Sequence, residues 1–422
     1  MRVLWITNQC LPQIAERLKL EKGVFEGWNI FPSEMLASNS QIEFAVASPA
    51  PISIETYQIV ETEGITGYIF DVKSIRHQKR MIQIWKDVAA HFNPDIVHIQ
   101  GTEMAHGMLY IKANGNKNVV ASIQGLTSVY ERYFYAGIDF MDILKHVSLY
   151  DLYSSNSIFA GRKRSQKSGI NEEICIKSLN HIIGRTTWDM VHAKSINPKI
   201  NYHFCNEILR KGFYQSPKWK YENCEKYSIF LSQCKYPIKA LHMVLKAMPL
   251  VLRYYPDAKI YIGSCLRIIP HRLIERIAPT NYGGYLLKMI KKMSLENHVV
   301  FLGNLSEEQM INQYLKANVF VSPSSIENSP NSLCEAQILG VPSVSSEVGG
   351  VCDLTQYGQT TFIYRFEEYE LLAYYICRVF KGDYNYCRFQ NAMADAEKRH
   401  NPQNNLNNMI RIYSTIMGGN EK

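Results

Sequence analysis

Short apolar runs rich in Val and Ile alternate along this chain with longer stretches whose apolar residues recur every three or four positions. Such short runs are typical of strands buried on both faces of a parallel sheet, whereas the longer period is typical of amphipathic helices. Their alternation predicts βαβ units and an α/β fold. Because the series occurs twice, we expect two doubly wound domains.

The same pattern places the individual elements. The longest apolar helical face in the second half comprises Leu241, Val244, Leu245, Met248 and Val251, which we expect to be core residues of a helix at 238–255. In the first half we expect helices at 81–92 and 141–150 and strands at 3–7, 43–47, 65–72, 96–99, 119–123 and 181–183. In the second half we expect strands at 228–231, 259–262, 299–302, 319–321 and 343–345.

A stretch without periodicity separates the two series. Residues 206–226 are polar, aromatic and basic and include Pro217, so we interpret them as a linker between an N-terminal domain at 1–205 and a second domain at 227–395. The last segment, 396–422, contains a helical apolar stripe that must pack on something and could cross back onto the first domain. Two doubly wound domains that face each other across a cleft would bind a ligand where the carboxyl ends of their strands converge.

Composition and charge narrow the function classes. Hydrophobic residues make up 46% and charged residues 20% of the 422 positions, which excludes wholesale disorder. The net charge of +8 favours anionic ligands. The 10 cysteines form no C-x-x-C pair, and no His cluster has ligand spacing, so we expect reduced thiols and no metal site. Since no signal-peptide core and no run of 18 apolar residues occur, we expect a cytoplasmic protein.

The most informative stretch runs from 321 to 342, where Glu327 and Glu335 flank a Ser-, Asn- and Pro-rich turn before a helix. One interpretation is structural, because Ser332 and Glu335 fit a capping box. The functional interpretation places an anion, such as a diphosphate, on the helix-start amides of Asn331, Ser332 and Leu333. Glu327 could then accept hydrogen bonds from sugar hydroxyls, and Glu335 could accept both hydroxyls of a ribose.

This stretch resembles a known family. Glu327 and Glu335 reproduce the E-x7-E signature of the retaining GT-B glycosyltransferases of family 4, also called glycosyl transferases group 1. The segment 340–351, with Gly340-Val-Pro342 and Gly349-Gly350, is similar to the G-x-P and G-G context of that signature. The resemblance implies a GT-B fold, two Rossmann-like domains, and binding of a nucleoside-diphosphate sugar by these residues.

The resemblance extends upstream of the signature. Lys239 matches the family lysine that grips the donor phosphates, whereas Gln233 replaces the family arginine, as in a similar polysaccharide-building branch. Lys235 could supply part of the missing charge. The alternative for Lys239 is a solvated lysine in the first turn of a helix, which would oppose the helix dipole unless an anion lies nearby.

Candidate acceptor or cleft residues lie in the first half. Gly27 corresponds to the glycine-bearing first loop of the family, and Gln124 stands where many relatives have a histidine near the donor sugar. Gln124 cannot titrate, so it cannot shuttle a proton. Arg185, at the carboxyl end of a strand, could meet an anionic substrate or form a salt bridge between the domains. His98 could be a core histidine or a functional one.

Some basic residues could touch an anionic membrane surface, although a solvated surface is the commoner explanation for such residues: Arg17, Lys19, Lys22, Arg162, Lys163, Arg164 and Lys167. The resemblance implies a lipid-linked saccharide as one acceptor class, used at the inner face of the plasma membrane.

The function that the resemblance implies is a retaining, metal-independent hexosyltransferase without a cofactor. It would move a sugar from a nucleoside-diphosphate sugar to a saccharide or lipid-linked saccharide in cell-surface polysaccharide biosynthesis. Glu327 would orient the donor sugar and Lys239 would stabilise the leaving diphosphate. Two alternatives stay open: a GT-B nucleotide-sugar epimerase, and a non-catalytic nucleotide- or sugar-binding protein. The sequence has no P-loop, no G-x-G-x-x-G motif and no nucleic-acid-binding module, so nucleotide hydrolysis by a P-loop, nicotinamide redox chemistry and nucleic-acid binding are unsupported.

Overall fold

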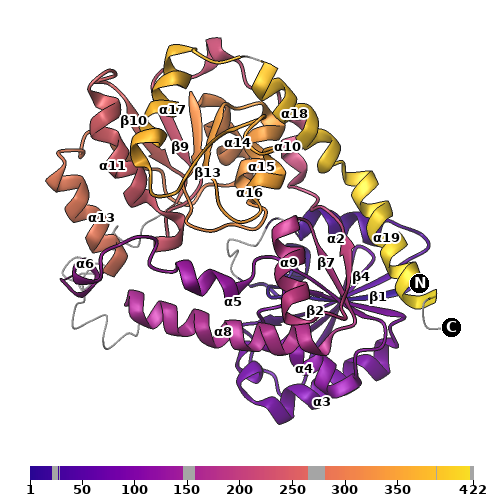
Figure 1. The fold of residues 1–422 in the computed structure, drawn as a ribbon. Coiled ribbons are helices and arrows are strands. Elements are labelled where there is room, and N and C mark those ends of the chain that lie inside the picture. The colour runs from indigo at the N-terminus through magenta and orange to yellow at the C-terminus, as the bar shows by residue number, and fades with distance from the viewer. Residues whose placement is uncertain (21–26, 28, 146–156, 265–280, 386, 419–422) are drawn as a thin grey trace. The chain divides into compact units, whose positions relative to one another are not determined.

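The computed structural model describes residues 1–20, 27, 29–145, 157–264, 281–385 and 387–418, and the chain divides into two compact units (Figure 1). The first unit comprises Met1–Ser128, Lys167–Arg210 and His400–Lys422, and the second comprises Val129–Gln166 and Lys211–Arg399.

The described strands of the first unit form one eight-stranded sheet of order β3-β4-β2-β1-β5-β6-β7-β8. All neighbouring pairs are parallel except β3 with β4, which are antiparallel. The strands are β1 (Arg2–Ile6), β2 (Glu43–Ala50), β3 (Gln58–Thr62), β4 (Ile65–Asp71), β5 (Ile96–Gln100), β6 (Val119–Ser122), β7 (His181–Gly184) and β8 (Asn201–Phe204). The helices are α1 (Pro12–Arg17), α2 (Ile30–Ala37), η1 (Val72–Arg76), α3 (Gln78–Phe92), α4 (Ala105–Asn114), α9 (Thr187–Ile196) and α19 (Pro402–Gly418).

The described strands of the second unit form a six-stranded parallel sheet of order β11-β10-β9-β12-β13-β14. They are β9 (Ser228–Leu231), β10 (Lys259–Ile262), β11 (Val299–Phe301), β12 (Val319–Ser322), β13 (Ser343–Ser346) and β14 (Phe362–Tyr364). Its helices are α6 (Phe140–Lys145), α10 (Lys211–Gln215), η3 (Tyr221–Asn223), η4 (Pro237–Lys239), α11 (Leu241–Leu252), α13 (Asn281–Lys292), α14 (Glu307–Lys316), α15 (Asn331–Leu339), α16 (Val351–Leu354), α17 (Tyr369–Lys381) and α18 (Cys387–Arg399). Two short helices, α5 (Thr127–Tyr130) and η2 (Glu131–Tyr133), begin at the boundary of the units, and α8 (Ile158–Ser178) contains the second boundary.

Both sheets share one topology. Starting from β1 or β9, the chain first adds strands on one side, which are β2, β4 and β3 in the first sheet and β10 and β11 in the second, and then returns to build the other side. This is the doubly wound order, in which the strand order reverses between β1 and β5 and between β9 and β12. The prediction of two Rossmann-like domains is confirmed. Ligands of such sheets bind beyond the carboxyl ends of the strands near the reversal point.

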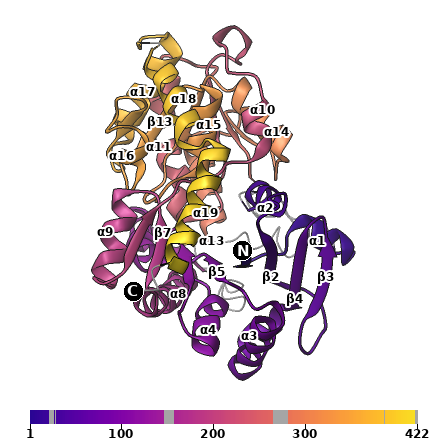
Figure 2. The same cartoon turned by 90° about the vertical axis from the view of Figure 1, so that its right-hand side faces the viewer.

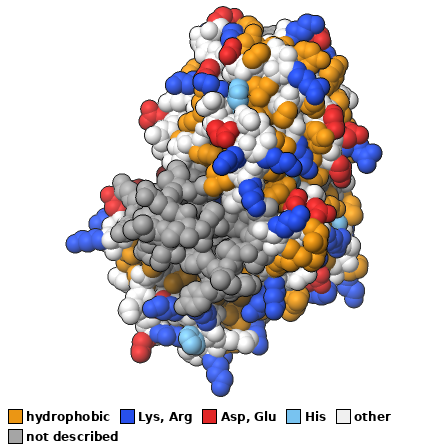
Figure 3. Space-filling view, turned by 90° about the vertical axis from the view of Figure 1, so that its left-hand side faces the viewer, with side chains coloured by type: hydrophobic (Ala, Val, Ile, Leu, Met, Phe, Trp, Pro, Cys, Tyr) orange, Lys and Arg blue, Asp and Glu red, His pale blue; other side chains and the backbone are white. Residues whose placement is uncertain are grey.

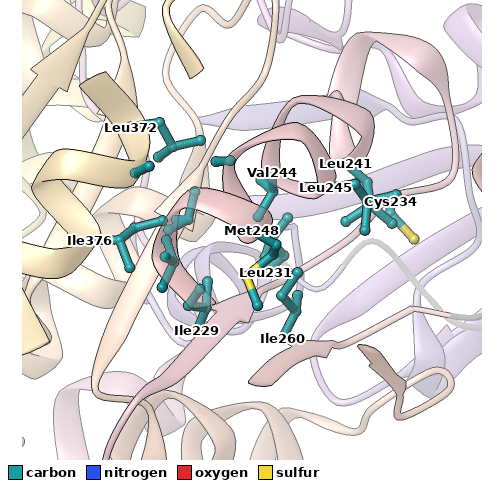
Figure 4. Packing of buried hydrophobic residues seen from close by; sticks show 14 of the residues in the cluster. Ile229, Leu231, Cys234, Leu241, Val244, Leu245, Met248, Ile260, Leu372 and Ile376 are labelled. Atoms are coloured by element: carbon teal, nitrogen blue, oxygen red, sulfur yellow. The ribbon is translucent and has the colours of Figure 1, made fainter. Parts of the chain in front are cut away.

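The core of the second unit forms where α11 and α17 pack on the sheet (Figure 4). The predicted apolar face of α11 is confirmed, since all five of its residues are fully buried. Each fully buried side chain of this size contributes roughly 1.5–3 kcal/mol relative to its exposed form. The helix itself begins at Leu241, and Pro237–Lys239 form the short 3₁₀ turn η4 ahead of it, shorter than the single helix predicted at 238–255.

The closing helix α19 packs within the first unit, beside α2 (Figure 2). Tyr413 of α19 is buried, and its hydroxyl accepts a hydrogen bond of 3.0 Å from Trp5 Nε1 of β1. The same hydroxyl lies 2.7 Å from His98 Nδ1 of β5. The apolar stripe read from the sequence therefore covers the β1–β5 region of the first sheet.

The unit boundaries differ from the predicted domains 1–205 and 227–395, because residues 129–166 group with the second unit. One anchor of this segment is His242 of α11, whose Nε2 donates to the Ala136 carbonyl at 2.8 Å. With Nε2 protonated, Nδ1 accepts from the Tyr282 hydroxyl at 3.0 Å. Hydrophobic periodicity reports local structure and does not indicate such tertiary contacts, so the sequence pattern could not predict this boundary.

Much of the predicted linker at 206–226 is also folded. Residues from Lys211 onward belong to the second unit and include α10 and η3. Trp219 explains the attachment: its backbone N–H donates to Leu339 at 2.7 Å, and its indole N–H donates to the Ala317 carbonyl at 2.7 Å. Trp219, and Phe213 of α10, which is fully buried, therefore serve packing.

Three strands were not predicted. β3 and β8 lie at the two edges of the first sheet, and β14 lies at one edge of the second. Edge strands carry polar or half-exposed residues, and β14 has only three residues, so none of them produces a continuous apolar run. The predicted helix at 141–150 is present as α6 from Phe140 to Lys145, and its remainder lies outside the described residues. No described helix has both the length and the apolar character needed to cross a membrane.

The buried histidines predict acid sensitivity. Burial lowers the pKa of His242 from 6.5 to about 4, so the folded state holds it neutral while the unfolded state binds a proton below pH 6.5. Stability that this neutral histidine contributes is present at pH 7 and is lost as the pH falls from 6.5 toward 4. At about 1.4 kcal/mol per pKa unit, the loss between pH 7 and pH 5 is about 2 kcal/mol.

We expect His242→Gln to flatten the dependence of the free energy of unfolding on pH between pH 7 and pH 5, measured by urea denaturation. The control is His77→Gln, since His77 is exposed. Equal slopes for wild type and His242→Gln would contradict the assignment.

Candidate active site

Three loops at the carboxyl ends of β9, β12 and β13 converge in the second unit, because these strands are neighbours in a parallel sheet. The Ser325 N–H donates to the Ile238 carbonyl at 2.8 Å, which ties the loop after β12 to the loop after β9. The Gly350 N–H donates to the Glu327 carbonyl at 3.0 Å, which ties it to the loop after β13. The structure thus brings together Lys239, Glu327 and Gly350, which are far apart in the sequence.

The centre of this arrangement is an ion pair. Lys239 Nζ lies 2.5 Å from Glu327 Oε1, and the side chains are 20% and 10% exposed. Lys239 is the last residue of η4 and precedes Ala240, a left-handed residue at the start of α11. The alternative of a freely solvated lysine at 239 is wrong, because its charge is largely buried and paired. In an ion pair buried to this extent, removal of one partner leaves the other charge buried without compensation, which is strongly destabilising.

Gly349 shows why the signature contains two glycines. Its φ is +53°, and a Cβ at this position would lie 1.9 Å from the Glu327 carbonyl oxygen. No other residue permits this approach, so the Gly-Gly loop fixes the backbone of Glu327. The glycines thus affect the site indirectly, because they hold the backbone that carries the Glu327 carboxylate.

The start of α15 differs from the predicted capping box. Pro330 is the N-cap, no side chain caps the helix, and the Ser332 carbonyl instead accepts from the Tyr314 hydroxyl at 2.9 Å. The helix begins at Asn331, two residues before the capping-box pattern implies, so Ser332 lies inside it. The Leu333 N–H donates to the Pro330 carbonyl at 3.0 Å, whereas those of Asn331 and Ser332 have no protein acceptor among the described residues. Two of the three predicted donors are therefore available to an anion.

Glu335 is buried at 5% exposure one turn further along α15. Its Oε2 lies 3.5 Å from the hydroxyl of Tyr314, a residue of α14 that the sequence analysis did not single out. The Tyr314 hydroxyl contacts both the start of α15 and the second glutamate. No sequence signal marks this role, because the stripe containing Ile311 and Tyr314 is equally typical of a core-facing helix. Gln233, in the loop after β9, is half-buried.

The predicted acceptor residues lie in the first unit. Arg185, after β7, forms a 2.6 Å ion pair with Glu207, and these side chains are 4% and 10% exposed. Both residues belong to the first unit, so this is not the salt bridge between domains considered from the sequence. Its partner also neutralises the charge that was expected to meet an anionic substrate. Gly27 packs against Arg210, since a Cβ there would lie 2.8 Å from the Arg210 Cδ atom.

His98 serves the core of the first unit. Because Trp5 Nε1 donates to the Tyr413 hydroxyl, that hydroxyl donates to His98 Nδ1 at 2.7 Å. His98 Nε2 then carries the proton and donates to Ser122 Oγ at 2.7 Å. Burial, together with the charge of Arg185, lowers the pKa of His98 to about 3, so the ring is neutral. Among the described residues, no group of three or more His, Cys, Asp or Glu side chains could hold a metal ion.

Comparison with known proteins finds similar sequences for the segment that contains this site. Residues 215–400, which include nearly all of the residues discussed for the second unit, match the family model described as glycosyl transferases group 1. Among curated proteins, an uncharacterized glycosyltransferase of Methanocaldococcus jannaschii is 23% identical over 195 residues, which cover 46% of this chain and 46% of that protein. The chain thus covers less than half the length of that relative.

Solved structures resemble nearly the whole chain. Sucrose-phosphate synthase of Thermosynechococcus elongatus has a TM-score of 0.72 at 13% identity, with 99% of each chain covered. Anabaena HepE, solved in complex with UDP-glucose, has a TM-score of 0.66 at 12% identity, with 98% of this chain and 100% of that chain covered. These likenesses concern the fold, and they confirm the predicted GT-B fold.

We expect Gly349→Ala to displace Glu327 and to lower the free energy of unfolding by about 3 kcal/mol, because the Cβ meets a carbonyl oxygen. Gly382→Ala is the matched control. Its φ is +73°, but nothing lies within 4 Å of its Cβ position, so only the backbone strain of about 1 kcal/mol remains. Urea denaturation measures both, and equal losses would contradict the close approach.

Proposed function

We propose that this chain is a retaining glycosyltransferase that transfers a hexosyl group from a nucleoside-diphosphate sugar to a saccharide or lipid-linked saccharide. The observation that carries the proposal is the Lys239–Glu327 pair at the strand-order reversal of the second sheet, inside the segment that matches a glycosyltransferase family. The HepE complex with UDP-glucose supports a nucleotide-sugar donor for this chain.

In the proposed reaction, the positively charged groups bind the diphosphate and the two glutamates bind the sugars. Lys239 and the amides of Asn331 and Ser332 bind the diphosphate and stabilise the negative charge that develops when it leaves. At an effective dielectric of 20, a cation about 4 Å from a phosphate oxygen interacts with it by roughly 4 kcal/mol before desolvation. Glu327 accepts hydrogen bonds from the donor sugar, and Glu335 accepts those of the ribose. No metal ion or cofactor takes part in this proposal.

In this proposal the ion pair keeps Lys239 and Glu327 charged and in position before the donor binds. In the free protein each charge satisfies the other, so neither is left buried and alone. A phosphate that approaches Lys239 replaces the carboxylate as the partner of the ammonium. Glu327 is thereby released to bind sugar hydroxyls. The acceptor hydroxyl oxygen then bonds to the anomeric carbon on the face that the diphosphate leaves. The diphosphate carries away the electron pair of the broken bond, and its departing oxygen accepts the proton of the acceptor hydroxyl.

We further propose that the chain acts in cell-surface polysaccharide biosynthesis, at the inner face of the plasma membrane. Its support is the basic composition and the resemblance of the sequence to a polysaccharide-building branch. On the face shown in Figure 3, Lys and Arg side chains are interspersed with acidic and apolar ones. A contact of this face with an anionic membrane would accordingly rest on dispersed cations.

We expect Lys239→Met to weaken the binding of UDP tenfold to a hundredfold, since it removes roughly 1.4–2.8 kcal/mol of attraction for the diphosphate. Lys259→Met is the control, because Lys259 is exposed at the start of β10, away from the carboxyl ends of the strands. Isothermal titration calorimetry measures both, and equal affinities of wild type and Lys239→Met would count against the phosphate role.

We expect Glu327→Gln to lower turnover at least a hundredfold while UDP binds as well as before or more tightly, because Lys239 then loses its neutralising partner. The assay incubates the protein with a panel of nucleotide sugars, with and without saccharide acceptors, and follows UDP release. Glu308→Gln, on an exposed part of α14, is the control. Full turnover by Glu327→Gln would remove the assignment. Donor conversion without an acceptor would instead indicate an epimerase, and binding without UDP release would indicate a binding protein.

A further inference from the structure

Two of the places where the chain crosses between the units are fastened to each other by one face of α8. The first crossing follows Ser128, and the second lies inside α8, between Gln166 and Lys167. On the first-unit side of that helix, Gly169 and Glu172 are three residues apart and therefore share a face. Both lie against Ser128, so the end of one crossing is held to the start of the other.

Glu172 is a fully buried carboxylate that takes no part in the proposed reaction. Its Oε2 accepts hydrogen bonds from the Ser128 N–H at 2.8 Å and from the Ser128 hydroxyl at 2.7 Å, and its Oε1 accepts from the Thr102 hydroxyl at 3.0 Å. Burial raises the pKa of Glu172, and these hydrogen bonds oppose that shift because they stabilise the charged form. Hydrogen bonds to a carboxylate are shorter and stronger than neutral ones, so the carboxylate closely fixes the position of Ser128.

Gly169 allows the backbone of Ser128 to approach α8. A Cβ at position 169 would lie 2.7 Å from Ser128 Cα and 3.0 Å from Ser128 N, so any larger residue would displace that backbone. Glycine in a helix interior is destabilising relative to alanine. The contact with Ser128 is thus formed at the expense of helix stability.

Ser128 also begins a stiff connection into the second unit. Residues 127–133 form α5 and η2 with no loop between them, and Tyr130 and Phe134, which flank η2, have right-handed helical backbone angles. Rigid secondary elements of this kind transmit a displacement along the chain. A shift of Ser128 is therefore passed on to Tyr133.

The far end of this connection is fastened to the loop that carries Glu327. The Tyr133 carbonyl accepts a hydrogen bond of 3.2 Å from Ser325 Oγ, and Ser325 lies two residues before Glu327. Three residues after Tyr133, the Ala136 carbonyl is held by His242 of α11. A continuous series of contacts and helical backbone thus leads from α8 to the loop of the candidate active site.

We propose that Glu172 is a positioning residue for the candidate active site, which sets the loop of Glu327 through Ser128 and the helical segment 127–133. The effect on turnover rests on the proposed glycosyl transfer, whereas the mechanical link from α8 to the loop does not. Since Glu327 is the group proposed to bind the donor sugar, displacing its loop lowers turnover. UDP binding depends on Lys239 and the start of α15 and changes much less.

Hydrogen exchange of the nucleotide-free protein, followed by mass spectrometry, tests the link without any substrate. We expect Glu172→Ala to speed exchange by about tenfold in segments 129–138 and 322–328, while segment 299–305 of the same unit keeps its rate. Glu173→Ala is the matched control, because Glu173 is the next residue of α8 and its half-exposed carboxylate pairs with Lys177 at 3.2 Å.

Three results would overturn the proposal. Faster exchange confined to the first unit would show that the link ends at Ser128. Equal acceleration of segment 299–305 would show a merely structural role. The same exchange pattern in Glu172→Ala and Glu173→Ala would show that the buried carboxylate has no special effect.

A pair of variants separates positioning from stability. Ser128→Ala and Thr102→Val each remove one hydroxyl bond to the same carboxylate, but only Ser128 leads into the helical segment. We expect similar losses in urea midpoint from both, whereas only Ser128→Ala lowers kcat, roughly threefold to tenfold, at unchanged KM. Equal kcat values for the two variants would contradict the positioning role.

The conservative variant Glu172→Gln provides a rescue. Its amide oxygen can still accept from Ser128 while its NH₂ group donates to the Thr102 hydroxyl. We expect it to recover most of the turnover that Glu172→Ala loses, with UDP affinity within about twofold of wild type in both variants. No recovery, or a parallel loss of UDP affinity, would contradict the proposal.

Failure of this inference is distinguishable from failure of the proposed function. If the chain transfers no sugar, hydrogen exchange still decides whether Glu172 sets the loop. If exchange shows no link, Lys239→Met and Glu327→Gln still decide the donor site.

Discussion

The ion pair between Lys239 and Glu327 is the interaction on which the site of the second unit depends. It joins a residue ahead of α11 to a residue in the loop after β12, and both side chains are largely removed from water. Such a pair is costly to assemble and costly to break, so the surrounding backbone must hold both ends. The hydrogen bonds from Ser325 to Ile238 and from Gly350 to Glu327 do this, and Gly349 leaves the space that the second of them needs.

The fold explains why these loops meet. In a parallel sheet all strands end at the same edge, and the reversal of strand order between β9 and β12 separates the helices that would otherwise cover that edge. The first unit repeats the arrangement between β1 and β5, and a small cavity lies at the corresponding edge. The two edges differ in charge chemistry. In the second unit the cation is a lysine, Lys239, paired with Glu327, whereas in the first unit it is the more deeply buried Arg185, paired with Glu207.

The sequence predicts the buried parts of this molecule well and its tertiary contacts poorly. Central strands are continuous apolar runs, and the apolar face of α11 is periodic, so local pattern was sufficient for both. A sequence motif identified the two glutamates and the glycine pair. Only the three-dimensional structure shows that Glu327 pairs with Lys239 and that a side chain at Gly349 would clash with the Glu327 carbonyl. The contact of the Tyr314 hydroxyl with Glu335 is likewise seen only in the structure. Arg185 is instructive: a basic residue after a strand suggests anion binding, and only the fold shows that Glu207 lies beside it.

The most direct test is a crystal structure of the chain with an intact nucleoside-diphosphate sugar. The account predicts that the diphosphate lies against the start of α15, with Lys239 Nζ about 3 Å from a phosphate oxygen and Glu327 turned from the lysine to the sugar hydroxyls. A bound donor that leaves the Lys239–Glu327 pair intact, or that binds elsewhere in the chain, would contradict it.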